Sequence, residues 1–232
     1  YGVNDKLFTA DGKSYIDFSS GYGSVIVGHA NKVVNEALKS QVDKLWVSGK
    51  YIHSLLGQTY RLIESFLNEN YYVAELYSTG MESIEFCFRI AAIQTGHTSY
   101  GGFANSMHGK SLAASSLSWS NPFSLPNFYQ VPFIESQKES DILVQIEKIF
   151  ESEDIAAFFV EPIQGSSGGA SATVSFYRSV IELCKANNVV SIFDEILTGF
   201  FRAGSSSYCL SHDLTPDIIV FGKSMGNGFP VS

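Results

Sequence analysis

Cysteine is scarce in this sequence of 232 residues, which holds only Cys87, Cys184 and Cys209. Their odd number and wide spacing argue against the disulfide framework of a small secreted domain. Two of them fall on predicted helices among apolar residues, so we expect buried free thiols in a reducing compartment. No signal peptide is visible, and our expectation is therefore a cytoplasmic protein.

Basic residues and long apolar runs are scarce as well. Lys and Arg number 15 against 23 Asp and Glu, and the net charge of -8 argues against nucleic acid or an anionic membrane as a partner. The most apolar stretch, residues 155–160, has the length of a buried strand and is far shorter than the ~20 residues that a membrane span needs. A composition of 45% hydrophobic and 16% charged residues favours a well-packed globular enzyme. It leaves room for a small anionic ligand, because local backbone dipoles can bind a phosphate.

The beginning of the chain predicts small elements. Residues 7–18 predict a hairpin around Asp11-Gly12, a dipeptide typical of tight turns. Apolar residues at helical spacing predict helices near residues 32–45 and 55–67.

We expect two structural units. Residues 1–50 form an N-terminal hairpin and helix segment that is part of a small domain, and residues 51–232 form a large domain. The chain starts at Tyr1 and stops at Ser232 without a closing helix. We therefore expect a fragment, or the ordered part of a longer protein, with the large domain truncated at its C-terminal end.

Strands and helices alternate from residue 72 onward. The hydrophobic pattern predicts strands at residues 72–77, 99–103, 128–131, 155–161, 189–194 and 217–223. It predicts helices at residues 81–95, 142–150 and 174–186, the first of them closed by Gly96. This alternation predicts an α/β fold with a mostly parallel sheet covered by helices on both faces.

Four distinctive segments lie at the ends of predicted strands. They are residues 78–82, residues 161–165, Asp194-Glu195 and Lys223. Ligands bind beyond the carboxyl ends of the strands in such sheets, so we expect these segments to converge in space although they are distant in sequence.

The first of these segments has the features of a phosphate site. Thr79 and Glu82 stand at capping-box spacing where a helix begins, and Gly80 lets a ligand approach the backbone closely. Free amides and the positive end of the helix then favour an anion. Taken alone, the segment favours an ordinary helix cap with a glycine turn over a phosphate site.

Asp194 and Lys223 each end an apolar strand. A carboxylate is costly to bury without a cationic partner or several donors, so Asp194 is either functional or part of a structural cap or salt bridge. A lysine at a partly buried strand end can become nucleophilic toward an aldehyde, although a lysine reaching to solvent is the simpler alternative.

The three features together indicate pyridoxal 5'-phosphate (PLP) more strongly than any one of them alone. The loop would hold the phosphate, Asp194 would pair with the ring nitrogen, and Lys223 would form the Schiff base. Protonation of the ring nitrogen makes the ring an electron sink.

The order of the motifs resembles the class III aminotransferases of PLP fold type I. The resemblance covers nearly the whole chain and implies the large domain of that fold, with a C-terminal small domain beyond Ser232. The segments that carry the resemblance are residues 11–18, Gly28-His29, residues 79–82, His108-Gly109, residues 161–165, residues 194–204, and residues 216–230 around Lys223.

The resemblance implies roles for individual residues. Lys223 is the Schiff-base residue and proton shuttle, Asp194 pairs with the pyridinium, and Ile196 packs against one face of the ring. The implied cofactor-binding residues are Thr79, Gly80, Met81, Met107, His108, Glu161, Asp194, Ile196 and Lys223. No metal site is expected.

Three positions depart from the family pattern. Met107 stands where an aromatic residue usually stacks on the ring, and Leu197 stands where many members carry Gln or His near the 3-oxygen. Ser166 replaces a Glu of the ornithine and γ-aminobutyrate enzymes, which argues against those two substrates.

The expected activity is transfer of an amino group between an amine or amino acid and a keto acid or aldehyde. An aminomutase, decarboxylase or racemase of the same fold is the alternative, since the same anchors serve all of them. A non-catalytic PLP-fold binding module is a third interpretation. The resemblance also implies a homodimer with the site at the subunit interface.

Overall fold

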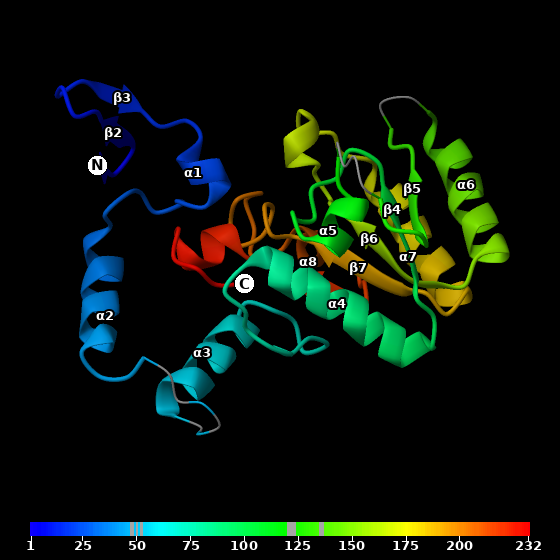
Figure 1. Ribbon diagram of the computed structural model, residues 1–232, viewed down its shortest axis with the longest axis horizontal. Coiled ribbons are helices and arrows are strands. Elements are labelled where there is room, and N and C mark those ends of the chain that lie inside the picture. Colours follow the sequence, from blue (N-terminus) through cyan, green and yellow to red (C-terminus); the bar gives the residue numbers. More distant parts are fainter. Residues whose placement is uncertain (47–48, 50, 52, 120–123, 135–136) are drawn as a thin grey trace.

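A five-stranded sheet forms the main body of the protein in the computed structural model, which describes residues 1–46, 49, 51, 53–119, 124–134 and 137–232 (Figure 1). Its strands are β4 (Ser99–Phe103), β5 (Phe128–Val131), β6 (Ile155–Val160), β7 (Val190–Asp194) and β8 (Ile218–Val220). They are hydrogen-bonded in the order β5-β4-β6-β7-β8, and every neighbouring pair is parallel. The carboxyl ends of all five strands therefore lie at one edge, as the predicted α/β fold requires.

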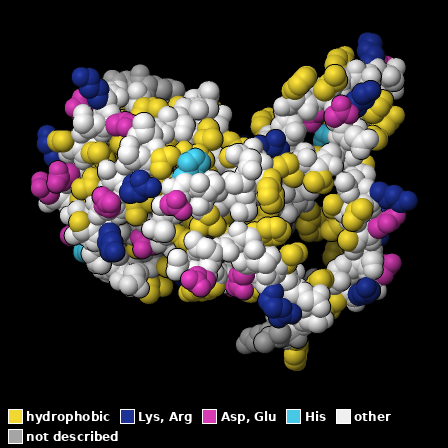
Figure 2. Space-filling view, turned by 180° about the vertical axis from the view of Figure 1, so that it is seen from behind, with side chains coloured by type: hydrophobic (Ala, Val, Ile, Leu, Met, Phe, Trp, Pro, Cys, Tyr) yellow, Lys and Arg dark blue, Asp and Glu magenta, His cyan; other side chains and the backbone are white. Residues whose placement is uncertain are grey.

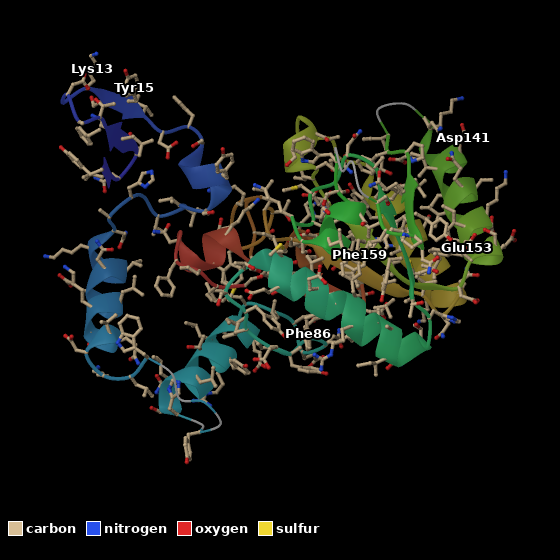
Figure 3. The ribbon with its side chains drawn as sticks, in the orientation of Figure 1. Lys13, Tyr15, Phe86, Asp141, Glu153 and Phe159 are labelled. Atoms are coloured by element: carbon tan, nitrogen blue, oxygen red, sulfur yellow. The ribbon has the colours of Figure 1, made fainter. Side chains whose placement is uncertain are left out.

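The central strand β6 shows why this sheet is buried on both faces. All six of its residues are buried, which suits an uninterrupted apolar sequence in a covered parallel sheet. Because side chains alternate along a strand, Phe158 and Phe159 enter different hydrophobic clusters. The ring of Phe159, labelled in Figure 3, lies 4.6 Å from that of Phe88 in the helix α4 (Gly80–Thr95).

Helices cover both faces of the sheet, as predicted. One cluster includes side chains of α4 (Gly80–Thr95) and α5 (Leu112–Ser116), and the other includes side chains of α6 (Glu139–Ser152) and α7 (Val174–Ala186). Helix α4 ends at Gly96, whose left-handed φ of 77° confirms the predicted glycine cap. Among the described residues, no helix is both long and apolar enough to cross a membrane.

The N-terminal arm, residues 1–46, projects to one side of the sheet (Figure 1). It contains β1 (Gly2–Val3), β2 (Lys6–Phe8), β3 (Ser14–Ile16), α1 (Ser20–Gly23) and α2 (Lys32–Val42). The predicted hairpin and the first predicted helix are thus confirmed, and α2 ends three residues earlier than predicted. None of the arm's residues is buried. Helix α3 (Ser54–Glu64), the second predicted helix, leads from the arm to the body, residues 71–232.

Apolar side chains remain exposed on this arm. Phe18 is 93% exposed and Trp46 is 80% exposed. Figure 2 shows hydrophobic side chains along the arm and along the part of the body that faces it.

The prediction of a strand at residues 72–77 is wrong. Tyr77 exchanges two backbone hydrogen bonds with Ser232, at 2.7 and 2.8 Å, but the segment forms no ladder with the sheet. A cavity of about 120 Å³, lined by Val73, Val220 and Phe221 among others, lies between the segment and β8. Aromatic and β-branched residues favour an extended chain, but a strand also needs a neighbour within hydrogen-bonding distance.

The predicted strand at residues 217–223 is too long. Strand β8 ends at Val220, and Lys223 begins a short 3-10 helix, η2 (Lys223–Gly226), with a left-handed φ of 44°. Other short elements were not predicted, because hydrophobic periodicity needs a longer window than they provide. They are α1, α5, α8 (Tyr208–Ser211), β1 and η1 (Gly165–Ser167).

The expectation of buried free thiols is confirmed. Cys87 lies in α4, Cys184 in α7 and Cys209 in α8, and all three are buried and unbridged. Burial raises the pKa of the Cys87 thiol to about 12, so it is an inert part of the core.

Candidate active site

Asp194 is a buried acid at the carboxyl end of β7. Only 3% of the residue is exposed. Its Oδ2 lies 2.8 Å from Nδ1 of His108, and its Oδ1 accepts a hydrogen bond from the backbone N–H of Ile196 at 3.0 Å. These two partners offset the desolvation energy of the buried carboxylate, and they hold its plane in one orientation.

His108 reaches Asp194 from the segment after β4 and is 1% exposed. Burial lowers the pKa of His108, but the hydrogen bond to Asp194 and the charges of Asp194 and Glu161 outweigh burial and raise the pKa above its ordinary value. The protonated imidazole is therefore favoured beside the carboxylate. The imidazole thus places a donor within 2.8 Å of the buried carboxylate.

Glu161, the residue after β6, adds a second buried carboxyl group. It is 5% exposed, and burial raises its pKa to about 7. The positive charges of His108 and Lys223 act against this rise, while Asp194 adds to it. Oε2 of Glu161 also accepts a hydrogen bond from the backbone N–H of Met107 at 2.9 Å. The four ionisable groups thus lie close enough to affect one another.

Thr79 caps the N-terminus of α4. Its Oγ1 accepts a hydrogen bond from the N–H of Glu82 at 3.3 Å and donates to Oε2 of Glu82 at 3.0 Å. The carboxylate binds the Thr79 hydroxyl rather than the Thr79 amide, so only half of the predicted capping box forms. The N–H groups of Gly80 and Met81 donate to no acceptor within the described parts of the chain. This leaves two amides free at the positive end of a 16-residue helix.

Ile196 connects the helix terminus with the lysine turn. A Cβ placed on Gly80 would lie 2.5 Å from Cδ1 of Ile196, and one placed on Gly222 would lie 3.2 Å from its Cγ2. The side chain of Ile196 therefore packs between the start of α4 and the residue before Lys223. Gly80 is needed here because any side chain would collide with Ile196.

The structure brings the predicted site residues to the carboxyl edge of the sheet. Strand pairing places Asp194 beside Val220, three residues before Lys223, and the N–H of Glu195 donates to the carbonyl of Val220 at 2.8 Å. Met81 lies against Gly109, next to His108, where a Cβ would come within 2.9 Å of its Cγ. The predicted cofactor residues that meet here are Thr79, Gly80, Met81, Met107, His108, Glu161, Asp194, Ile196 and Lys223.

The two other departures from the family pattern lie at the rim of this region. Ser166 is exposed in η1. Leu197 packs against Gly165, where a Cβ would lie 2.0 Å from its Cδ2, and against Gly23 of the arm, where a Cβ would lie 2.7 Å from its Cδ1. The apolar side chain of Leu197 therefore packs between the arm and the loop after β6.

Sequence reasoning missed the role of Glu195. This residue is fully buried, and its carboxylate accepts hydrogen bonds from Ser207 Oγ at 2.6 Å and from the N–H groups of Tyr208 and Cys209 at 2.6 and 2.9 Å. It anchors the start of α8 and so fixes the loop that follows Asp194. Its place after a buried strand was a signal of burial, but these three partners lie twelve or more residues further along the chain. Among the described residues, no group of three potential metal ligands occurs.

Solved structures of transaminases share this fold. A transaminase from the marine bacterium Virgibacillus superposes with a TM-score of 0.92 at 26% identity, covering 99% of this chain and 56% of its own. The ornithine aminotransferase from Toxoplasma gondii, in a structure with partial occupancy of PLP at the active site, superposes with a TM-score of 0.85 at 27% identity, over 100% of this chain and 56% of its own. The fold is that of the PLP fold type I transaminases.

Sequence comparison leads to the family itself. The profile of the family described as aminotransferase class-III matches residues 2–232, and the chain belongs to this family. A curated relative is the [LysW]-aminoadipate semialdehyde/glutamate semialdehyde transaminase from Sulfolobus acidocaldarius, with 30% identity over 232 residues. The match covers 100% of this chain and 59% of that relative, so the chain spans under two thirds of the relative's length.

Proposed function

We propose that this chain forms the cofactor-binding part of a PLP-dependent aminotransferase. The observation that carries the proposal is the meeting of three anchors around Ile196: the free amides of Gly80 and Met81, the buried carboxylate of Asp194, and Lys223. Membership of the class III family supports the same activity.

The residues present fit PLP in charge and in chemistry. Two unpaired amides at the start of α4 suit a phosphate dianion although the chain is acidic overall, because the interaction is local. Asp194 has its own ion-pair partner in His108, so it can accept one further positive or protonated group without losing its support. Lys223 lies on a turn at the carboxyl edge of the sheet, where its amine can reach an aldehyde.

Each residue then has a distinct task. When bound, PLP supplies an electron sink for the breaking of a bond at the substrate carbon next to nitrogen. Asp194, which pairs with His108, would hold a proton on the ring nitrogen, and Ile196 would pack against the ring. Lys223 would attach the cofactor and move a proton as a general acid and base.

The substrates we propose are an amino donor, either an amine or an amino acid, and a keto acid or aldehyde acceptor. Leu197 and Gly165 form an apolar rim at the loop after β6, and Ser166 brings no carboxylate there. These residues support a donor without a cationic group at that position, in contrast to ornithine.

We further propose that the complete protein is a cytoplasmic homodimer whose site lies at the subunit interface. The unburied arm supports this proposal, since residues such as Phe18, Tyr22 and Trp46 expose large apolar surfaces. Residues 1–50 then belong to a small domain and residues 51–232 to the large domain. Sedimentation of the complete protein as an active monomer would contradict the dimer.

A labelling experiment tests the cofactor assignment. The complete protein is incubated with PLP, reduced with borohydride and digested, and the pyridoxyl group is expected on the peptide that carries Lys223. The Lys223→Arg variant is expected to lose the label, whereas Lys148→Arg, a matched change at an exposed position of α6 away from the anchors, should retain it. A label on another lysine in the unchanged protein would overturn the assignment.

A donor screen tests the reaction. An aminotransferase turns over only when both an amino donor and a keto acid or aldehyde are present. Steady turnover of the donor without any acceptor would identify a mutase, decarboxylase or racemase instead.

A further inference from the structure

The turn that carries Lys223 holds the N-terminal arm at two points. Ser224 follows Lys223 directly and is 5% exposed, and its Oγ donates a hydrogen bond to the backbone carbonyl of Gly23 at 3.1 Å. Three residues later, Oδ1 of Asn227 accepts from the N–H of Val27 at 3.0 Å, and its Nδ2 donates to the carbonyl of Gly28 at 3.3 Å. These bonds join segments that are about two hundred residues apart in the chain.

The loop after Asp194 holds the same point of the arm. Nη2 of Arg202 donates to the carbonyl of Gly23 at 3.1 Å, so this oxygen accepts from both Arg202 and Ser224. Leu197 packs against the α-carbon of Gly23, which has a left-handed φ of 83° and leaves no room for a side chain. A carbonyl with two donors, one of them charged, is well stabilised.

The local backbone is strained, so bonds from the body help to hold its conformation. Ser20 and Tyr22 both have left-handed φ angles, 48° and 58°, although neither is glycine. Such conformations are strained in residues other than glycine and persist only where surrounding contacts impose them. Part of that support is local, because Oδ1 of Asp17 accepts from the N–H of Ser20 at 3.1 Å and the carbonyl of Ser20 accepts from the N–H of Val25 at 2.9 Å. The arm has no buried residues to add to it, and the body supplies further support through Gly23 and residues 27–28.

We propose that Ser224, Arg202 and Asn227 are positioning residues that lock arm residues 19–28 onto the turn carrying Lys223. The lock makes this part of the arm and the lysine turn one rigid unit, so the arm sets where Lys223 stands and the lysine turn sets where the arm stands. The proposal rests on the proposed PLP site for its functional meaning, but the lock itself is a property of the chain without the cofactor.

Hydrogen exchange of the PLP-free complete protein tests the lock directly. In Ser224→Ala, amides of residues 19–28 should exchange about fivefold faster, the loss expected from one neutral hydrogen bond. Arg202→Lys, which keeps the charge but loses the guanidinium geometry, should raise exchange in the same segment. Ser206→Ala is the matched control, because Ser206 also donates its hydroxyl to a distant carbonyl, that of Phe66 at 3.1 Å, away from Lys223. Exchange at residues 19–28 that is equal in Ser224→Ala and Ser206→Ala would overturn the lock.

A spectroscopic measurement on the PLP-loaded protein tests the positioning role. Visible circular dichroism of the bound cofactor reports its fixed orientation, and we expect it to fall in Ser224→Ala and Asn227→Ala but not in Ser206→Ala. Unchanged dichroism in both lock variants would contradict positioning. If the unchanged protein fails to take up PLP, the proposed function is wrong, while the exchange measurement still decides the lock.

Discussion

The body and the N-terminal arm differ in the interactions that stabilise their folded conformations. The body has two hydrophobic clusters, one on each face of the sheet, with phenylalanines such as Phe158 and Phe159 that are fully buried. The arm has no buried residue and keeps its form through backbone pairing, the contact of Asp17 with His29 at 2.8 Å, and its bonds to the lysine turn. The body is therefore built for stability, and the arm is positioned by a few polar contacts.

The largest expected effect comes from the charged pair in the body. Asp194→Asn retains the shape of the side chain but removes the charge that keeps a proton on the cofactor's ring. We expect the rate of amino transfer to fall on the order of 10³-fold or more, with PLP still bound. Asp43→Asn, an exposed change on the arm, should leave the rate near that of the unchanged protein. Near-normal turnover in Asp194→Asn would show that its role is structural.

Truncating one apolar side chain in each region shows how much each region's packing contributes to the free energy of unfolding. Phe158→Ala removes a fully buried ring and should lower the free energy of unfolding by about 3–5 kcal/mol. Val33→Ala in α2 removes a side chain that belongs to a residue 76% exposed, and it should change that free energy by no more than about 0.5 kcal/mol. Urea unfolding of both variants measures the difference. Similar losses in the two variants would contradict the contrast between body and arm.

The pH dependence of stability should arise in the body. Burial raises the pKa of Glu161 from 4.5 to about 7, so the folded protein holds this proton more tightly than the unfolded chain does. The stabilisation is fully present below pH 4.5 and is lost as pH rises through 7, by up to about 3 kcal/mol. The raised pKa of His108 acts in the same direction, because its protonated form is also favoured by folding.

Glu161→Gln tests this contribution, because the amide can still accept the bond from Met107 but does not titrate. Urea unfolding from pH 5 to pH 8 should show a smaller fall in stability for the variant than for the unchanged protein. Parallel pH curves would show that Glu161 does not carry this dependence.

Much of the body was predictable because its signals are local. The apolar run at residues 155–160 predicts a buried strand, and α7 begins and ends where periodicity placed it. The places of the candidate site residues were predictable for the same reason, since Asp194 ends a buried strand, Glu161 follows one, and Thr79 has a capping residue's sequence context. The strand predicted at residues 72–77 does not form, because β propensity does not reveal whether a partner strand lies beside the segment.

The sequence by itself determined the order of the five sheet strands and of the longer helices, the edge where the candidate site lies, and the residue types that meet there. These depend on the spacing of apolar residues and on which residues follow each strand. Only the tertiary structure decided that His108 is the partner of Asp194, that Glu195 anchors the start of α8, and that Gly23 accepts bonds from Ser224 and Arg202. Those contacts join residues between 12 and 201 positions apart, and no local pattern encodes which distant groups the packed sheet will bring within 3.1 Å of each other.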